Sequence, residues 1–275
     1  MNQIFRLNEL SFTYSDKNGI KQTENDFELK DVSFNIDCGD FVSVIGKNGS
    51  GKSTLVKLIS KILNGYSGNI FFKGNEIRSI ERKEFSRNVS YLPQTASAFN
   101  EELKVSEFLL LGRYAHKQFT DFRFSQDDLR IVTESMSETS VTDLSGKFIH
   151  KLSGGEKQKV LITLALVQLD ITDSLEGKVL IIDEPMTYLD VNYQFEIFSI
   201  LKRLREKKLT VIIVIHDLNL ALRFSNRTIL MNKGKLIKYD LTGEVITEEI
   251  LKEHFLIDSK ILNFEKNFFI NYLPN

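Results

Sequence analysis

The sequence has a single cysteine, almost no net charge and no long apolar run. Cys38 is alone among 275 residues, which excludes a disulfide framework and fits a reducing compartment such as the cytoplasm. The 36 Lys and Arg residues nearly balance 37 Asp and Glu residues, so the formal charge is −1. The charge balance therefore does not indicate nucleic acid or an anionic lipid surface as a partner.

Features of membrane insertion and secretion are also lacking. The most apolar stretch, residues 160–169, is interrupted by Thr163 and Gln168, whereas a membrane span needs about 20 apolar residues. Residues 1–10 lack the apolar segment of a signal peptide. We therefore expect the chain to reach a membrane only through a partner.

What the sequence does have is a series of apolar runs with strand and helix spacing. Continuous apolar runs, typical of strands covered on both faces, lie at 41–45, 179–182 and 211–215. Shorter strand-like runs lie at 69–72 and 228–231. Two stripes with helical spacing lie between them, one at 55–62 that ends at Asn64–Gly65 and one at 193–204. Strands and helices that alternate in this way predict a doubly wound α/β core.

Two stretches differ from this alternation. Residues from about 96 to 157 predict a helical insertion without strands, in which Ser106 and Ser125 are candidate helix starts. Residues 241–275 carry mixed helical signals and no motif. We treat them as a C-terminal extension of unknown role.

A glycine-rich loop between a predicted strand and a predicted helix fits G-x-x-x-x-G-K-[ST]. Its glycines let backbone N–H groups surround a phosphate without a Cβ in the way, and the following helix adds its positive end. Lys52 is predicted to reach the β and γ phosphates of ATP, and the Ser53 hydroxyl to bind Mg²⁺. The predicted nucleotide-binding residues are Gly46, Asn48, Gly49, Ser50, Gly51, Lys52, Ser53 and Thr54.

The strand at 179–182 ends in two adjacent acids, Asp183 and Glu184. Neighbouring side chains of a strand point to opposite sides, so the two acids cannot do one job. Asp183 is the predicted Mg²⁺ ligand, and Glu184 is predicted to activate the water that attacks the γ phosphate. An acidic turn after a core strand is the alternative, and the upstream phosphate loop disfavours it.

A second glycine motif opens the apolar helix that precedes this strand. Ser153, Gly154, Gly155 and Glu156 follow Leu152 at a predicted helix start, where a hydroxyl and free N–H groups make an anion site. One chain has no evident use for two such sites on one nucleotide. Two copies arranged head to tail would each offer this motif to the ATP of the other.

The phosphate loop, the LSGG motif and the strand with its two acids together resemble the ATPase family of ABC transporters, over roughly residues 4–240. The resemblance implies a P-loop NTPase core with a mostly parallel sheet, an N-terminal antiparallel β subdomain and an inserted α-helical subdomain. It implies ATP hydrolysis with Mg²⁺ and coupling to membrane permease subunits. The ATPase domain is expected to span 1–240.

Four further positions follow from the resemblance. Tyr14 matches the aromatic residue that stacks on adenine, and Gln94 matches the glutamine that links the metal site to the permease. Asp190 matches the loop that crosses the dimer interface, although it could also simply cap a helix. His216 matches the histidine that contacts the γ phosphate. Departures from the family pattern are Glu156, where glutamine is commonest, and Pro185–Tyr188 in place of P-T-S-A/G.

Residues 111–116 (LGRYAH) and 216–221 (HDLNLA) resemble the subfamily that serves importers of iron–siderophores, haem and cobalamin. This implies an iron chelate as cargo, an extracellular substrate-binding protein as an indirect partner, and a position on the cytoplasmic face of the membrane. Ala115 stands where this subfamily usually has proline.

Other classes fit less well. An ABC ATPase of translation or DNA repair would normally carry two ATPase halves or a long coiled-coil insert, and a small-molecule P-loop kinase would lack the LSGG motif. A purely structural module would have no reason to combine Lys52, Asp183, Glu184 and His216. The remaining alternatives are the ATPase of an exporter or of an importer for another small solute.

Overall fold

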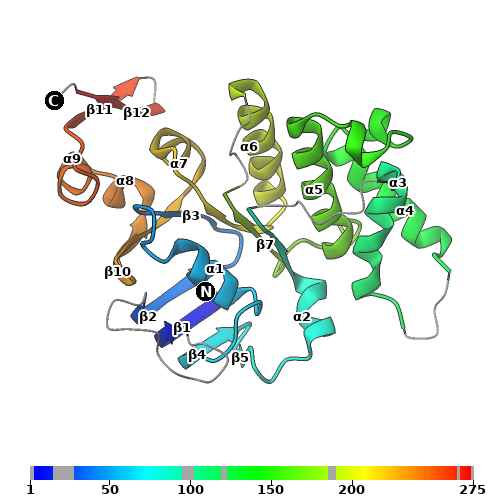
Figure 1. The fold of residues 1–275 in the computed structure, drawn as a ribbon, viewed down its shortest axis with the longest axis horizontal. Helices are drawn as coiled ribbons and strands as arrows, with labels where there is room; N and C mark the ends of the chain where they lie inside the picture. Colours follow the sequence, from blue (N-terminus) through cyan, green and yellow to red (C-terminus); the bar gives the residue numbers. More distant parts are fainter. Residues whose placement is uncertain are drawn as a thin grey trace. The chain divides into compact units, whose positions relative to one another are not determined.

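The computed structural model describes residues 3–14, 28–94, 102–118, 123–184, 190–264 and 267–273. The chain forms two compact units, one made of Met1–Ser79 with Ile212–Asn275 and the other of Ile80–Val211. Figure 1 shows the helices and strands with their labels. The predicted boundaries near residues 96, 157 and 240 stay predictions.

The first unit contains an antiparallel sheet of order β2-β1-β4-β5. Its strands are β1 (Gln3–Thr13), β2 (Glu28–Asp37), β4 (Ser67–Phe72) and β5 (Asn75–Glu76). Strand β1 pairs antiparallel with both β2 and β4, and register shifts interrupt both pairings. In β1 the buried residues alternate at Phe5 and Leu7 and again at Leu10 and Phe12, with a register shift between the two pairs.

The same unit contains the strand that leads into the phosphate loop. Strand β3 (Phe41–Ile45) pairs parallel with β9 (Arg227–Asn232), which pairs antiparallel with β10 (Lys235–Leu241). The order here is β10-β9-β3-β8, where β8 is Thr210–Val214. All five residues of β3 are buried, which confirms a strand covered on both faces. Helices α1 (Lys52–Ile59) and α7 (Leu218–Phe224) follow β3 and β8 along the chain.

The C-terminal part of the first unit continues from β10 into short elements. They are α8 (Thr242–Val245), α9 (Glu248–Ile250), the π-helical turn η4 (Leu251–Phe255), and the antiparallel hairpin β11 (Ser259–Phe264) and β12 (Asn267–Tyr272). A buried chain of hydroxyls joins this part to the sheet, since Thr228 bonds both Ser43 (2.7 Å) and Thr242 (3.0 Å).

The second unit contains β7 (Val179–Asp183), which pairs parallel with β6 (Val89–Leu92), in the order β8-β7-β6. Helices α3, α4 and α5 pack on one another (Figure 1). The remaining elements are α2 (Arg82–Asn88), α3 (Val105–Leu110), η1 (Leu111–Ala115), α4 (Gln126–Glu138), η2 (Thr142–Leu144), η3 (Ile149–Lys151), α5 (Gly154–Leu169) and α6 (Val191–Glu206).

The predicted α/β class with a parallel sheet is confirmed, and details of the elements differ. Helix α1 ends at Ile59, before the predicted stop, because Lys61 takes a left-handed conformation; Ile62 is 54% exposed and leaves the apolar stripe. Ser106 lies inside α3, which begins at Val105. Ser125 does cap α4, through a hydrogen bond from the Asp128 N–H.

Between residues 96 and 150, the described part of the chain contains helices and no strand, as predicted. Its β pairing is limited to an isolated bridge between Lys104 and Phe148. No helix within the described ranges is long and apolar enough to cross a membrane.

Candidate functional site

The predicted phosphate loop turns sharply between β3 and α1 because its glycines have backbone angles that other residues rarely adopt. Gly46 has a φ of 147°, and a Cβ there would lie 2.2 Å from the Met231 carbonyl oxygen. Gly49 and Gly51 also have positive φ angles, of 75° and 104°. Gly46 therefore lets the loop leave β3 against the backbone of β9, which a side chain would prevent.

Two polar side chains of this loop, Lys52 and Ser50, are buried. The Lys52 ammonium donates to the carbonyl oxygens of Gly46 (2.9 Å) and Lys47 (3.2 Å), and the residue is 4% exposed. The Ser50 hydroxyl is buried and makes no hydrogen bond within the described residues. A buried cation and an unsatisfied buried hydroxyl fit an anionic group such as a phosphate, which would satisfy both.

Two further predicted residues belong to the same unit. The Tyr14 hydroxyl and the Thr54 hydroxyl of α1 lie 3.2 Å apart, while the Tyr14 ring is 45% exposed and packs edge-on against Phe12. His216 follows β8, whose end is tied to β3 by the hydrogen bond from the Ile215 N–H to the Val44 carbonyl (3.2 Å). The structure thus brings Tyr14 to the loop's helix and His216 to the end of the sheet where the loop begins.

In the second unit, Asp183 at the end of β7 and Glu184 directly after it have different surroundings. Asp183 is 1% exposed and accepts a hydrogen bond from the Tyr91 hydroxyl (3.1 Å). Glu184 is half-buried, has a φ of 50°, and accepts a hydrogen bond from the Gln94 amide (2.7 Å). A left-handed conformation is uncommon for a residue other than glycine. The structure therefore joins the predicted base to Gln94.

The predicted metal ligands are Ser53, Gln94 and Asp183. Their oxygen atoms are of the kind that Mg²⁺ prefers. Across the described ranges, no group of three or more His, Cys, Asp or Glu residues could hold a metal ion. Mg²⁺ usually takes only one or two protein carboxylates and completes its shell with phosphate oxygens and water.

The LSGG motif starts α5 with a capping box. The Ser153 hydroxyl accepts from the Glu156 N–H (3.3 Å), and the Glu156 carboxylate accepts from the Ser153 N–H (2.8 Å). The bond from the Ser153 N–H lowers the pKa of Glu156, and an ion pair with Lys147 (3.1 Å) adds to this. Glu156 therefore has a structural role that glutamine could share, while Ser153 and Gly154 are exposed.

Gly155 of this motif and Asp190 both lie next to Tyr193 of α6. A Cβ on Gly155 would lie 2.4 Å from the Tyr193 ring, so the glycine allows α5 and α6 to approach closely. Asp190 caps α6 by accepting from the Tyr193 N–H (3.0 Å). The capping role foreseen as an alternative for Asp190 is therefore present. Pro185–Leu189, which precede it, lie outside the described residues.

Gly112 and Arg113 of the LGRYAH segment are buried in the second unit, and Arg113 forms an ionic network. The Arg113 guanidinium donates to Asp128 (2.8 Å), to Asp170 (3.1 Å) and to the Val167 carbonyl (3.1 Å), and its side chain is 6% exposed. His116 shares a hydrogen bond with the Gln168 carbonyl (2.7 Å), and burial lowers the pKa of His116. This motif therefore holds η1 against α5 and α4.

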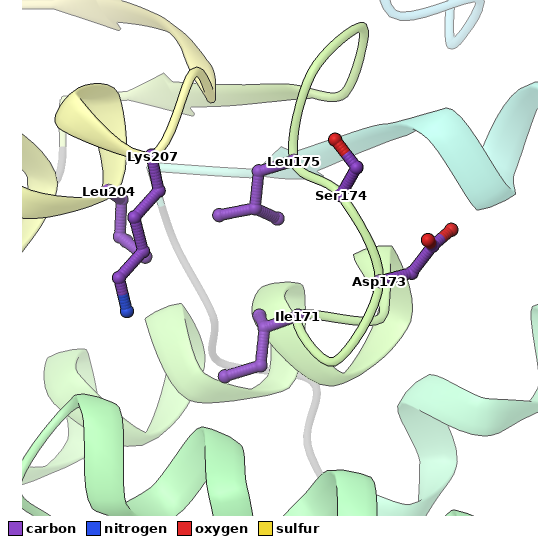
Figure 2. Close-up of a pocket in the computed structure, with 6 residues that line it drawn as sticks. All are labelled: Ile171, Asp173, Ser174, Leu175, Leu204 and Lys207. Atoms are coloured by element: carbon purple, nitrogen blue, oxygen red, sulfur yellow. The ribbon is translucent and has the colours of Figure 1, made fainter.

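A separate pocket of about 210 Å³ lies in the second unit between the loop after α5 and the end of α6 (Figure 2). Its wall combines apolar and charged side chains, and Lys207 also pairs with Glu138. No predicted site residue lines it. The lining residues are Ile171, Asp173, Ser174, Leu175, Leu204 and Lys207.

Sequence reasoning missed two partners of the site. Tyr91 precedes Gln94 by three positions and faces Asp183, and only the parallel pairing of β6 with β7 brings them together. Tyr193 covers Gly155, which no spacing in the sequence indicates.

Comparison with known proteins agrees with this arrangement. The family model described as ABC transporter matches residues 29–187. The iron(3+)-hydroxamate import ATP-binding protein FhuC of Bacillus subtilis is 37% identical over 85% of this chain and 84% of its own length. The petrobactin import ATP-binding protein FpuC of Bacillus anthracis is 34% identical over 88% and 87%.

A solved structure shows the same fold. The ADP conformation of MJ1267, an ATP-binding cassette of an ABC transporter, superposes with a TM-score of 0.77 at 22% identity, covering 93% of this chain and 99% of that one. The likeness confirms the predicted P-loop NTPase fold. By its matched family model and by relatives that it covers over most of their length, the chain belongs to the ABC transporter family as an ATP-binding subunit that hydrolyses ATP.

Proposed function

We propose that this ATPase energises the uptake of an iron–siderophore or a related metal chelate through a separate membrane permease. The observation that carries the proposal is the similarity to two relatives named for import of iron(3+)-hydroxamate and of petrobactin, over more than four fifths of each chain. This favours import over the alternative of an exporter. The LGRYAH and HDLNLA motifs support the same subfamily.

The phosphate loop is the proposed binding site for the ATP phosphates. Lys52 and the backbone N–H groups at the start of α1 would neutralise their charge, and the unsatisfied Ser50 hydroxyl offers a further hydrogen bond. Tyr14 would stack on the adenine. Bound Mg²⁺ would supply charge neutralisation at the phosphate oxygens, held by Ser53, Asp183 and Gln94.

Glu184 is the proposed base, and Gln94 connects it to the transport cycle. Glu184 would accept a proton from the attacking water, while Lys52 and His216 stabilise the charge on the transferring phosphoryl group. The 2.7 Å hydrogen bond from Gln94 to Glu184 supports this connection, because a movement of Gln94 would directly disturb the carboxylate. Contact between the permease and the segment after β6 could then alter the rate of hydrolysis.

The proposed partners are the permease, a second copy of the chain and, indirectly, an extracellular substrate-binding protein. Ser153 and Gly154 are exposed at the start of α5, which supports their use by the ATP of a second copy, together with Gly155, Glu156 and Asp190. We place the subunit at the cytoplasmic face of the membrane, and we do not expect a nucleic acid partner.

Glu184→Gln tests the catalytic part of the proposal. General-base catalysis typically contributes about 10²–10⁴-fold, so hydrolysis by the purified variant should fall by that order while ATP still binds. The variant should also form an ATP-dependent dimer, detectable by size-exclusion chromatography. Glu206→Gln, on an exposed position of α6, is the matched control and should hydrolyse ATP normally. Hydrolysis near the wild-type rate in Glu184→Gln would remove this residue from the catalytic role.

Uptake of radioactive iron tests the cargo. A gene deletion should abolish uptake from at least one ferric siderophore, and the wild-type gene should restore it. Gln94→Ala removes a proposed metal ligand and the hydrogen bond to Glu184, so it should slow hydrolysis and uncouple the remaining hydrolysis from uptake. Normal uptake of every ferric siderophore, haem and cobalamin by the deletion strain would refute the proposed cargo and leave the ATPase function intact.

A further inference from the structure

The C-terminal hairpin β11–β12 packs on α7, the helix that begins directly after His216 (Figure 1). Ile270 of β12 is 5% exposed, whereas Phe269 beside it is 42% exposed. The hairpin is therefore anchored at Ile270, and its outer side chains face solvent. Residues 241–275 carry no catalytic motif, and the contact of the hairpin with α7 connects them to the segment that holds His216.

A polar contact accompanies the packing. The Ile270 N–H donates to the Asn219 side-chain oxygen at 2.7 Å. Asn219 occupies the first turn of α7, and it is part of the HDLNLA motif whose middle residues the proposed ATPase mechanism does not use. Its side chain thus joins the start of α7 to a strand that lies fifty-one positions later in the chain.

Capping hydrogen bonds tie the first turn of α7 to Asp217, the residue that follows His216. Asp217 caps the helix by accepting from the N–H groups of Asn219 (2.8 Å) and Leu220 (3.1 Å). Burial raises the pKa of Tyr272, and the negative charge of Asp217 adds to this. The end of β12 therefore also interacts electrostatically with the capping carboxylate. A displacement of Asn219 therefore displaces Asp217, which is joined to His216 by a peptide bond.

We propose that Asn219 is a positioning residue, through which the C-terminal hairpin holds the first turn of α7 and thereby the orientation of His216 toward the γ phosphate. The inference rests on the role given to His216 in the proposed function. The C-terminal extension would thus contribute to hydrolysis by restraining His216, which lies on an exposed segment after β8.

The test uses five variants of the full-length chain: Asn219→Ala, Asn219→Asp, His216→Ala, the double variant of His216→Ala with Asn219→Ala, and Asn263→Ala. Asparagine 263 is an exposed residue of β11 and serves as the matched control. Steady-state and single-turnover ATP hydrolysis give kcat and KM, and thermal unfolding gives Tm.

A misplaced catalytic group can cost about 100-fold in rate for a displacement of an ångström. We expect Asn219→Ala to lower kcat about tenfold, with an unchanged KM and a Tm shift of only a few degrees. Asn219→Asp keeps the acceptor oxygen and should restore kcat, and Asn263→Ala should leave it unchanged. If Asn219 acts through His216, the double variant should be no slower than His216→Ala alone.

Three results would overturn the proposal: an unchanged kcat in Asn219→Ala, a loss in the double variant equal to the product of the single losses, or a collapse of Tm in Asn219→Ala that Asn219→Asp does not reverse. A multiplicative loss would show that Asn219 acts independently of His216, and the collapse of Tm would show that Asn219 only supports the fold. Full hydrolysis by His216→Ala would instead refute the catalytic role of His216, which separates failure of the proposed function from failure of this inference.

Discussion

Replacing Arg113 with methionine removes the cation at the centre of the buried network in the second unit. Methionine keeps an unbranched apolar stem of similar reach, so the change isolates the charge and its hydrogen bonds. Arg113 donates to Asp128, to Asp170 and to the Val167 carbonyl. The side chains of the two acids are only 11% and 18% exposed. The variant therefore leaves two largely buried carboxylates without their principal counter-charge.

The structure sets the expected size of the effect. Removal of one partner of a buried ion pair costs about 3–5 kcal/mol. Asp128 keeps the hydrogen bonds from the Ser125 N–H (2.9 Å) and hydroxyl (3.0 Å), and Asp170 keeps one from the Thr172 hydroxyl (2.6 Å). The loss should therefore lie near the lower limit, about 3 kcal/mol. For a domain of 150–250 residues this lowers Tm by about 6–12 °C.

The loss should depend on pH. Burial by itself raises the pKa of Asp128 and Asp170, but hydrogen bonds and the charge of Arg113 hold each pKa below its usual value. In the wild type these carboxylates stabilise the fold above the unfolded-state pKa of about 4, and this stability is lost as the pH falls through the lower folded-state pKa. In Arg113→Met burial dominates, so the acids bind protons at higher pH. The gap between variant and wild type should shrink from pH 7 to about pH 4.5.

Urea unfolding at both pH values measures this gap. Arg113→Lys should recover part of the loss, because it restores the charge without the forked geometry. The control is Arg130→Met on α4, where an exposed arginine also pairs with two acids, Asp127 and Glu134. It should change the free energy of unfolding little. A cost below about 1 kcal/mol for Arg113→Met, with no dependence on pH, would refute the reasoning.

Three further substitutions test the predicted nucleotide sites. Lys52→Ala removes the charge proposed to hold the β and γ phosphates and should reduce ATP binding and turnover severely; near-normal ATPase activity would contradict the loop assignment. Gly46→Ala places a Cβ 2.2 Å from the Met231 carbonyl oxygen at a φ of 147°, so it should lower stability by about 1–3 kcal/mol and weaken nucleotide binding, measured by calorimetry. Gly155→Ala brings a Cβ to 2.4 Å from the Tyr193 ring and should cost about 1–3 kcal/mol in thermal unfolding, and an unchanged Tm would show that the ring moves aside freely.

Strands covered on both faces could be predicted from sequence because burial demands continuous apolar residues. The runs at 41–45 and 179–182 coincide with β3 and β7, whose residues are all buried. The phosphate loop could also be recognised from the sequence, because the positive φ angles of Gly46, Gly49 and Gly51 allow few residues other than glycine. Local chemistry determined these features, so no distant contact was needed to recognise them.

Elements with weaker local signals were not found from the residues themselves. Strand β1 carries an irregular pattern because its pairings with β2 and β4 contain register shifts. The hairpin β11–β12 was not predicted from the mixed signals of residues 241–275. Its strands bury only a few side chains, such as Ile270, so the alternation that indicates a strand is faint. It packs on α7, which lies far from it in the sequence.

The sequence by itself determined the family, the phosphate loop and the identities of the acids, because each rests on residue types at short spacing. Only the tertiary structure decided which side chains meet: Gln94 with Glu184, Tyr91 with Asp183, and Arg113 with the acids of α4 and the end of α5. Such pairs are separated by up to ninety-two positions, and their contact follows from strand pairing and helix packing. These arrangements minimise the free energy of the whole chain and leave no local trace in the sequence.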